Sequence, residues 1–281
     1  MADVGVARRR VPYVSLAVLV LMCLLAIFAP LLSPHSPVQN HVSDSLRPPF
    51  WQDGGTTEYL LGTDKLGRDI LSRAIHAARP ALLISLISIG IAAVVGSTLG
   101  IVAAYFGGLI DHIVTRAIDI MMSIPAMLLA LLLALRLSPG LRSVTIVVVL
   151  ILWASYARQV RGDAMVVMRK DYVALARAGG RRAFGIMTRH VLPNVVNTII
   201  VVATLQLGIV IILEGSLSYL GAGVPPPDPT WGDMIEDGRG LIESAWWVAI
   251  VPGVAIAGLV LAANVVGEWL EERLDPRRRD Q

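Results

Sequence analysis

The chain of 281 residues carries too little charge for a soluble protein of its length. Hydrophobic residues make up 55% of the sequence, charged residues make up 16%, and the mean hydropathy is +0.68, whereas a soluble domain carries roughly 25% charged residues. The single cysteine excludes an internal disulfide framework and a cysteine-based zinc site. The net charge of +3 is too small and too dispersed to predict nucleic-acid binding. The composition therefore predicts a membrane protein.

Six apolar runs follow one another along the chain, and we expect each to form a membrane-spanning helix. An α-helix needs roughly 20 residues to cross a hydrocarbon core of about 30 Å. The fourth run is short and must borrow residues from its flanks. The sequence thus predicts an all-α, polytopic membrane protein with six transmembrane helices, at residues 11–32, 81–105, 117–137, 141–158, 193–219 and 245–267.

Basic residues are unequally distributed between the segments that join these spans. With residues 1–10 inside, 16 of the 24 lysine and arginine residues lie on the cytoplasmic side and 8 lie outside. Because basic residues favour the cytoplasmic side, we expect both termini to be cytoplasmic and the first span to be an uncleaved signal anchor. The segments 33–80 and 221–244 are then extracytoplasmic, and the segments 159–190 and 268–281 are cytoplasmic.

The cytoplasmic segment 159–190 has the pattern of a helix, a turn and a second helix. Asp171 can cap a short helix, and Gly179 and Gly180 would end it. A second helix would follow, and Pro193 falls in the first turn of the fifth span, where its missing N–H costs nothing. Two interpretations are equally open: a helical knob on two spans that contacts another protein, or a basic amphipathic segment that lies on anionic lipid.

Two residues near the spans are candidates for function. Glu214 is the only carboxylate well inside a predicted span, and such residues are functional candidates by default. It either lines the transport path, where it would meet a substrate amine, or forms a hydrogen bond to a neighbouring helix, which is the simpler interpretation. Trp231 either belongs to an interfacial aromatic belt beside the sixth span or contacts a binding protein.

Two further groups of charged residues are expected to pair locally. The first group consists of Asp64, Arg68, Asp69 and Arg73, and pairing among them would fix the outer segment. The second group is Arg116 with Asp119, which would form an i,i+3 ion pair at the cytoplasmic interface.

The sequence contains no motif of a membrane enzyme. A phosphate-binding loop needs G-x-x-x-x-G-K-[ST], and neither Lys65 nor Lys170 follows a glycine. The five histidines form no H-E-x-x-H pair. We therefore expect no catalytic, cofactor or metal site. A secondary transporter or channel is the alternative class, but it would need ionisable residues at mid-membrane to bind coupling ions.

The stretch DYVALARAGGRRAFGIMTRHVLPN, residues 171–194, resembles the EAA loop of ABC importer permeases. The matching positions are Gly180, Leu192, Pro193 and, as the third residue of the EAA triplet, Ala176. The family's glutamate is Ala174 in this chain, and the alanine that follows it is Leu175.

Four more segments resemble the second, or C-type, subunit of dipeptide and oligopeptide permeases. In chain order they are LLGTDKLGRDILSR (60–73), GGLIDHIVTRAIDIMMSIP (107–125), SLSYLGAGVPPPDPTWGDMI (216–235) and LDPR (274–277). The resemblance extends from about residue 24 to residue 277, which is nearly the whole chain.

The resemblance implies the type I ABC importer permease fold, in a multi-pass protein of the inner membrane. It implies one transmembrane half of a peptide importer, with a B-type permease, two cytoplasmic ATPase subunits and an extracytoplasmic binding protein as partners. The ligand stays open between a dipeptide, a longer peptide, nickel and haem, because the binding protein makes the first selection. The EAA-type helix would dock on an ATPase as a coupling helix, through Asp171, Tyr172, Ala174, Leu175, Ala176, Arg177, Gly180 and Pro193.

Overall fold

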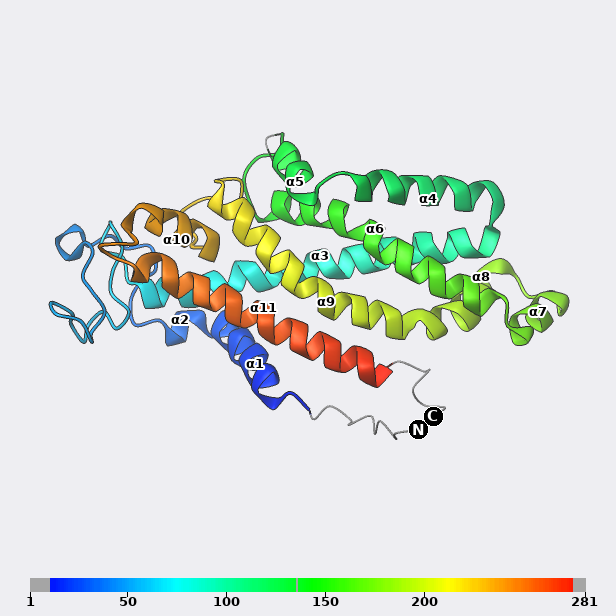
Figure 1. The fold of residues 1–281 in the computed structure, drawn as a ribbon, viewed down its shortest axis with the longest axis horizontal. Coiled ribbons are helices and arrows are strands. Elements are labelled where there is room, and N and C mark those ends of the chain that lie inside the picture. The colour runs from blue at the N-terminus through cyan, green and yellow to red at the C-terminus, as the bar shows by residue number, and fades with distance from the viewer. Residues whose placement is uncertain (1–10, 135, 275–281) are drawn as a thin grey trace, which may run out of the picture.

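The computed structural model describes residues 11–134 and 136–274, and its secondary structure in that part of the chain is helical. The all-α class is therefore confirmed. The predicted N-terminal segment 1–10 and most of the LDPR motif lie outside the described residues. Four long helices lie side by side along the molecule (Figure 1): α3 (Ile70–Phe106), α6 (Leu141–Met168), α9 (Leu192–Tyr219) and α11 (Trp247–Leu274).

These four helices are long and apolar enough to cross a membrane. A bent pair of helices, α4 (Gly108–Ser123) and α5 (Ala126–Ala134), is a fifth candidate. The first predicted span contains α1 (Tyr13–Ile27), which has 15 residues, and the short α2 (Ala29–Leu32). Because α1 is shorter than the roughly 20 residues of a full crossing, the count of six spans stays a prediction.

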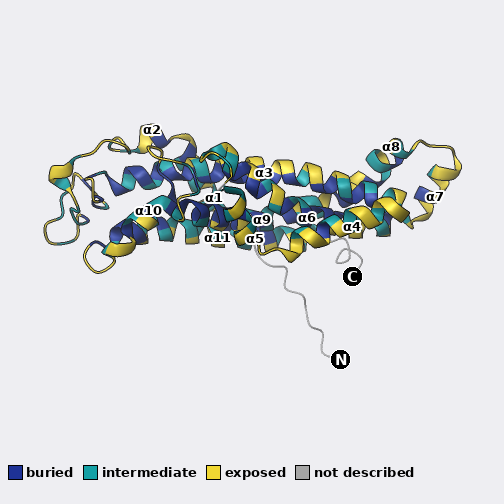
Figure 2. Cartoon of the chain, turned by 90° about the horizontal axis from the view of Figure 1, so that it is seen from above, coloured by how far each residue is buried: buried dark blue, intermediate teal, exposed yellow. Residues whose placement is uncertain are grey.

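Close packing of α3 on α6 forms the centre of the bundle. A Cβ atom added at Gly96 would lie 2.4 Å from the Trp153 carbonyl oxygen, and one added at Gly100 would lie 2.7 Å from that of Ala157. Only glycine allows the two backbones to approach this closely. Buried residues follow the inward sides of the long helices, whereas α4 and the end that carries α7 (Asp171–Ala178) are largely exposed (Figure 2).

The third apolar run is not the single straight span predicted for residues 117–137. The helix begins earlier, at Gly108, and breaks after Ser123, so that α5 lies at 87° to α4. Proline has no N–H and disfavours the helical conformation in the residue before it. Ile124, which precedes Pro125, accordingly adopts an extended conformation with φ −89° and ψ 128°.

The fourth run forms a longer helix than the predicted 141–158, because α6 continues to Met168. Charged side chains at and just beyond its expected end, residue 158, contact carboxylates of α4. Arg158 Nη2 lies 2.7 Å from Asp119 Oδ1, and Arg161 Nη2 lies 2.7 Å from Asp111 Oδ2. Asp119 thus pairs across two helices and not with Arg116.

The polar connections lie at the two ends of the bundle (Figure 1). One end carries the loops of residues 33–69, with a 3₁₀ turn at Val42–Asp44, and α10 (Trp231–Gly238), which leads into a second 3₁₀ turn at Arg239–Leu241. The opposite end carries α7 and α8 (Ala183–Ile186). The predicted topology requires the segments 33–80 and 221–244 to lie at one end of the bundle and the segment 159–190 to lie at the other.

Candidate functional site

The helix α7 projects from the end of the bundle, between α6 and α8 (Figure 1). It has the predicted extent, Asp171 to Ala178, but its N-cap residue is Lys170. Asp171 therefore does not cap the helix with its side chain. It lies in the first turn, where a carboxylate is favoured by the positive end of the helix dipole.

Gly180 ends α7 in the left-handed conformation that its sequence predicts. Its φ is +71°, a value that side-chain-bearing residues rarely adopt. The Gly180 N–H donates to the Arg177 carbonyl at 3.0 Å, and the Arg181 N–H donates to that of Ala176 at 3.1 Å. This pair of bonds is a Schellman motif, which fixes the direction in which the chain leaves the helix.

The two sides of α7 differ in exposure. Val173 is fully buried and packs in a cluster with residues of α6 and α8–α9. Leu175 is 72% exposed and Tyr172 is 42% exposed, and Ala174 between them is exposed too. The helix is therefore held by one side and presents an apolar surface on the other, which is typical of an interaction site.

Aromatic and basic side chains of α7 and of the residues that follow it contact α3 and η2. The Arg177 guanidinium lies 4.9 Å from the centre of the Tyr105 ring at the end of α3, within the range of a cation–π contact. The rings of Tyr172 and His190 lie 6.1 Å apart, and His190 Nε2 lies 2.7 Å from Arg181 Nη1. Arg177 thus contacts its own chain and does not stand free beside the exposed Leu175.

The chain after α7 returns to the membrane through one continuous helix. Helix α8 leads into a π-helical turn, η2 (Met187–Val191), and then into α9. The Leu192 N–H donates to the Met187 carbonyl, and Pro193 lies in the first turn of α9, as predicted. A widened turn accommodates a proline that cannot donate to the helical ladder. The segment from α7 to α8 is thereby joined to a long helix on each side.

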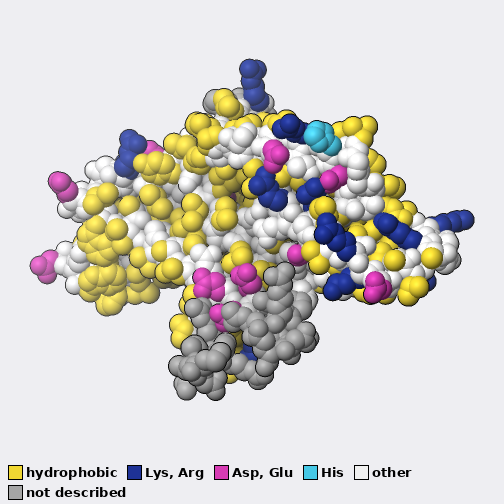
Figure 3. Space-filling view, turned by 45° about the vertical axis from the view of Figure 1, so that its right-hand side comes forward, with side chains coloured by type: hydrophobic (Ala, Val, Ile, Leu, Met, Phe, Trp, Pro, Cys, Tyr) yellow, Lys and Arg dark blue, Asp and Glu magenta, His cyan; other side chains and the backbone are white. Residues whose placement is uncertain are grey.

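Basic side chains gather at the same end of the molecule (Figure 3). The arginine and lysine residues of this segment are Arg169, Lys170, Arg177, Arg181, Arg182 and Arg189. Phe184, on α8, is 73% exposed. Exposed apolar and basic groups can bind an acidic protein surface or an anionic lipid surface. The geometry alone therefore does not decide whether this segment contacts another protein or lies on lipid.

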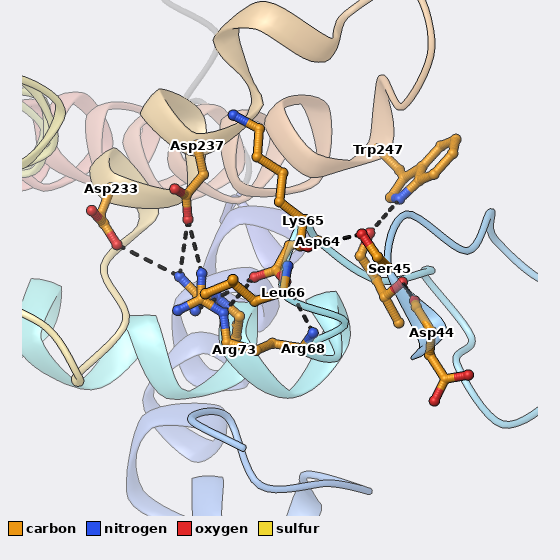
Figure 4. A network of polar contacts seen from close by, with 11 residues as sticks. Asp44, Ser45, Asp64, Lys65, Leu66, Arg68, Arg73, Asp233, Asp237 and Trp247 are labelled. Carbon is orange, nitrogen blue, oxygen red and sulfur yellow. Dashed lines mark hydrogen bonds and ion pairs between the residues drawn. The ribbon is translucent and has the colours of Figure 1, made fainter. Parts of the chain in front are cut away.

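A second polar site lies at the opposite end, where the predicted pairing of Asp64, Arg68 and Arg73 is confirmed (Figure 4). Asp64 accepts hydrogen bonds from the Leu66 and Arg68 N–H groups, both at 2.9 Å, and from Arg68 Nε at 2.6 Å. Asp69 instead caps α3, accepting from the Leu71 and Ser72 N–H groups.

Two members of this network were not predicted from the sequence. Asp237 Oδ2 lies 3.1 Å from Arg68 Nη2, and Arg73 Nη2 lies 3.5 Å from both Asp233 Oδ2 and Asp237 Oδ2. Both aspartates belong to α10, far from Arg68 in the sequence. Burial raises the pKa of Asp233 above its usual value, and the charge of Asp237 adds to this effect. The network joins the start of α3 to α10.

Trp231 lies inside the protein in this structure, and its contact with a binding protein stays a prediction. It is 1% exposed, and its indole N–H donates to the Ala74 carbonyl at 3.0 Å. The next residue, Gly232, packs so closely on α9 that an added Cβ would lie 2.0 Å from the Gly215 carbonyl oxygen. Trp231 thus anchors α10 against α3.

Glu214 is also buried, with 1% exposure. Its Oε1 accepts a hydrogen bond from Ser218 Oγ at 2.9 Å, one turn along the same helix. The predicted bond to a neighbouring helix is therefore wrong. The buried carboxylate does not open onto a path in this structure.

Several long apolar helices packed side by side are typical of an integral membrane protein with more than one span. A family model described as a binding-protein-dependent transport system inner membrane component matches residues 96–280. Another, described as the N-terminal transmembrane domain of oligopeptide transport permease C, matches residues 7–49. The chain belongs to the family of binding-protein-dependent transport system inner membrane components, which are transport subunits and not enzymes.

Relatives in several bacteria match almost the full length of the chain. The di/tripeptide transport system permease of Pseudomonas aeruginosa is 39% identical over 95% of this chain and 88% of its own length. The dipeptide transport system permease of Escherichia coli K12 is 37% identical over 96% of this chain and 90% of its own. The dipeptide transport system permease of Haemophilus influenzae is 35% identical over 94% of this chain and 90% of its own length.

Proposed function

We propose that this chain is one of two permease subunits of an ABC importer that takes up short peptides. Membership of the binding-protein-dependent family supports an importer of the inner membrane. Three relatives with dipeptide or di/tripeptide transport in their names match 94–96% of this chain. A permease of nickel or haem is less well supported by these relatives.

The end that carries α7 is proposed to be cytoplasmic, with both termini on the same side. Of the 24 basic residues, 16 fall on the side of α7 in this topology, as the preference of basic residues for the cytoplasm requires. The loops of residues 33–69 and the helix α10 then face the outside, where a binding protein would deliver its ligand.

Coupling to the ATPase subunits is proposed to pass through α7. The observation that carries this proposal is the exposed apolar pair Tyr172 and Leu175 on a helix that is otherwise fixed by Val173 and by the Schellman motif at Gly180. A rigid helix joined to α6 on one side and to α8–α9 on the other would transmit the movement of an ATPase to two spans as a rigid body.

Asp171, Ala174 and Ala176 are proposed to shape the docking surface, because they lie on the same short helix. Ala174 stands where the family has glutamate, so docking would depend on apolar contact and shape and not on a carboxylate at that position. Pro193 is proposed to act indirectly, by fixing how η2 enters α9. The other partners are a B-type permease, which would form the second half of the pathway, and the lipid bilayer.

Purification of the tagged chain from its native membrane tests this function. We expect two ATPase chains with phosphate-binding loops and a second permease to co-purify, and we expect the reconstituted complex to take up a labelled dipeptide only with ATP and a binding protein. Absence of an ATPase, together with uptake driven by an ion gradient, would instead establish the secondary transporter.

A further inference from the structure

The exposed surface of α4 divides into two stripes of different polarity. The apolar stripe consists of Leu109, Ile113 and Ile120, which are 74%, 58% and 61% exposed. The opposite side of the helix, with Ile118, is buried against α6. Between them runs a polar stripe of exposed residues, whose spacing of four, three and four positions places them on one side of the helix. The residues of the polar stripe are His112, Arg116, Asp119 and Ser123.

Both stripes lie at membrane depth when α4 and α5 form the third span of the proposed topology. Helix α4 has 16 residues, which corresponds to about 24 Å, so it needs its whole length and α5 to cross a core of about 30 Å. Asp119 follows Gly108, at the cytoplasmic end of α4, by eleven residues or about 16 Å. Leu109 and Ile113 expose apolar side chains nearer to that end. The apolar surroundings of α4 therefore extend past the carboxylate of Asp119.

Charged side chains at this depth avoid lipid and face protein or a water-filled cavity. The polar stripe carries such a pair, because Arg158 Nη2 of α6 lies 2.7 Å from Asp119 Oδ1. The side chains of Arg158 and Asp119 are nevertheless 49% and 50% exposed. About half of each charged side chain is thus open to a further partner, which comes from outside the described chain.

A second ion pair between the same two helices shows the difference. Arg161 donates to both carboxylate oxygens of Asp111, and the two side chains are only 24% and 22% exposed. This pair fastens α4 to α6. Asp119 and Arg158 are joined by a single bond among the residues that the structure describes, so a carboxylate oxygen and guanidinium N–H groups stay available for a ligand.

We propose that Asp119 and Arg158 line a water-filled transport path and bind the two ends of a peptide in transit, its ammonium group at Asp119 and its carboxylate at Arg158. The proposal rests on the function proposed above, which supplies the peptide and the path. A dipeptide carries one charge of each sign, and a guanidinium matches the geometry of a carboxylate. Each end of the peptide replaces one half of the ion pair, so that no charge in the membrane is left without a partner.

Two reporter positions on α4 test whether the polar stripe faces water. Ser123 belongs to the polar stripe, Ile120 belongs to the apolar stripe, and the two differ in depth by about 4.5 Å. A single cysteine is placed at either position in a Cys23→Ala background, and the complete complex in lipid nanodiscs is treated with a charged methanethiosulfonate. Mass spectrometry of this chain should find label at position 123 and little at position 120.

Two results of this labelling would overturn the proposal. Labelling at neither position would show that the partner permease covers the polar stripe. Equal labelling at both positions would show that the polar stripe has no special access to water.

Protection by a peptide tests the binding site itself. Increasing concentrations of alanyl-alanine, added to the complex without nucleotide, should slow the labelling at position 123. The same dipeptide with an acetylated amino end and an amidated carboxyl end has no charged ends, so it should give no protection at these concentrations. Equal protection by the two peptides would overturn the recognition of charged ends, and this comparison needs no substitution in the ion pair.

Substitutions in the pair then assign the two ends. Asp119→Asn and Arg158→Gln should each raise the concentration of alanyl-alanine for half-protection about tenfold, because a hydrogen bond to a charged group is worth about that factor. Labelling without peptide should not change. Asp111→Asn is the matched control and should keep normal protection, since its carboxylate is held by Arg161. Normal protection in both Asp119→Asn and Arg158→Gln would overturn the assignment.

Uptake by the same complex separates this site from the proposed function. If the complex takes up a labelled dipeptide with ATP and a binding protein, while alanyl-alanine does not protect position 123, the importer function stands and the site alone fails.

Discussion

Arg68 and Asp237 are separated by 169 positions in the sequence and are joined by a hydrogen bond of 3.1 Å. Because Asp64 holds the same arginine from the other side, the bond connects the outer loop before α3 with α10. The indole of Trp231 adds a second attachment of α10, to the carbonyl of Ala74. The end of the protein opposite to α7 is therefore one connected unit, which includes the start of α3.

Asp64→Asn should destabilise this unit strongly. The carboxylate accepts three hydrogen bonds and pairs with the buried guanidinium of Arg73, which would then keep only Asp233 and Asp237 of α10 as anionic partners. Breaking a buried pair costs about 3–5 kcal/mol when the remaining charge is left unpaired, so with these two partners we expect a loss of about 2–3 kcal/mol. Thermal unfolding in detergent measures the change, with the exposed Asp53→Asn as control. An equal effect of the two substitutions would contradict a structural role for Asp64.

Asp233→Asn should behave differently, because the pKa of Asp233 is raised by its burial and by the charge of Asp237. A raised pKa in the folded state means that the ionised form opposes folding at neutral pH, and that this cost disappears as the pH falls below the ordinary value. The asparagine variant should therefore be at least as stable as the wild type at pH 7, with a difference that shrinks toward about pH 4. Unfolding temperatures of the two proteins between pH 7 and about pH 4 measure this difference. An Asp233→Asn variant that is less stable than the wild type at pH 7 would contradict the prediction.

The topology can be tested by labelling single cysteines in a Cys23→Ala background. Gly54 lies in the loops of residues 33–69 and Pro226 lies in the connection between α9 and α10, which we propose to be extracytoplasmic, whereas Gly180 directly follows α7. A membrane-impermeant maleimide should label cysteines at the first two positions in intact cells, and should reach the third only after the membrane is permeabilised. Labelling of position 180 in intact cells would reverse the orientation.

Gly180→Val should uncouple ATP hydrolysis from uptake while the spans still insert. An added Cβ at this glycine meets no atom within 4 Å, so the cost comes from its φ of +71°. That conformation costs a residue with a side chain about 1–2 kcal/mol, and a change of backbone there would turn α7 away from its partner. Gly180→Asn is the matched control, since asparagine tolerates the left-handed conformation. Uptake per ATP hydrolysed should fall in the valine variant and be nearly normal in the asparagine variant.

Local signals in the sequence were sufficient to predict α7 and its end. The stop at Gly180 depends on glycine's conformational freedom, whereas the N-cap is Lys170 and not the predicted Asp171. The pairing of Asp64 with Arg68 was also predictable, because the two residues are four positions apart.

Features that depend on contacts between distant segments were not predictable. The ion pairs of Arg158 and Arg161 at the end of the predicted span join α6 to α4, a contact between segments that the sequence does not place side by side. The burial of Trp231 requires α10 to fold back onto α3. The break at Pro125 did carry a local signal, but the continuous apolar run around it has the pattern of one span.

We propose that α7 receives the ATPase through its exposed apolar side. The most direct measurement is the ratio of ATPase to permease that co-purifies with Leu175→Asp, compared with Ala174→Glu, which adds the same charge at the adjacent position and restores the family's glutamate. Leu175 is 72% exposed, so its replacement should leave the fold intact. We expect a loss of ATPase of about tenfold or more with Leu175→Asp, since about 1.4 kcal/mol of lost contact gives that factor, and full retention with Ala174→Glu. Retention by Leu175→Asp, together with loss on reversing Arg181 and Arg182 to glutamate, would show a segment that only rests on anionic lipid.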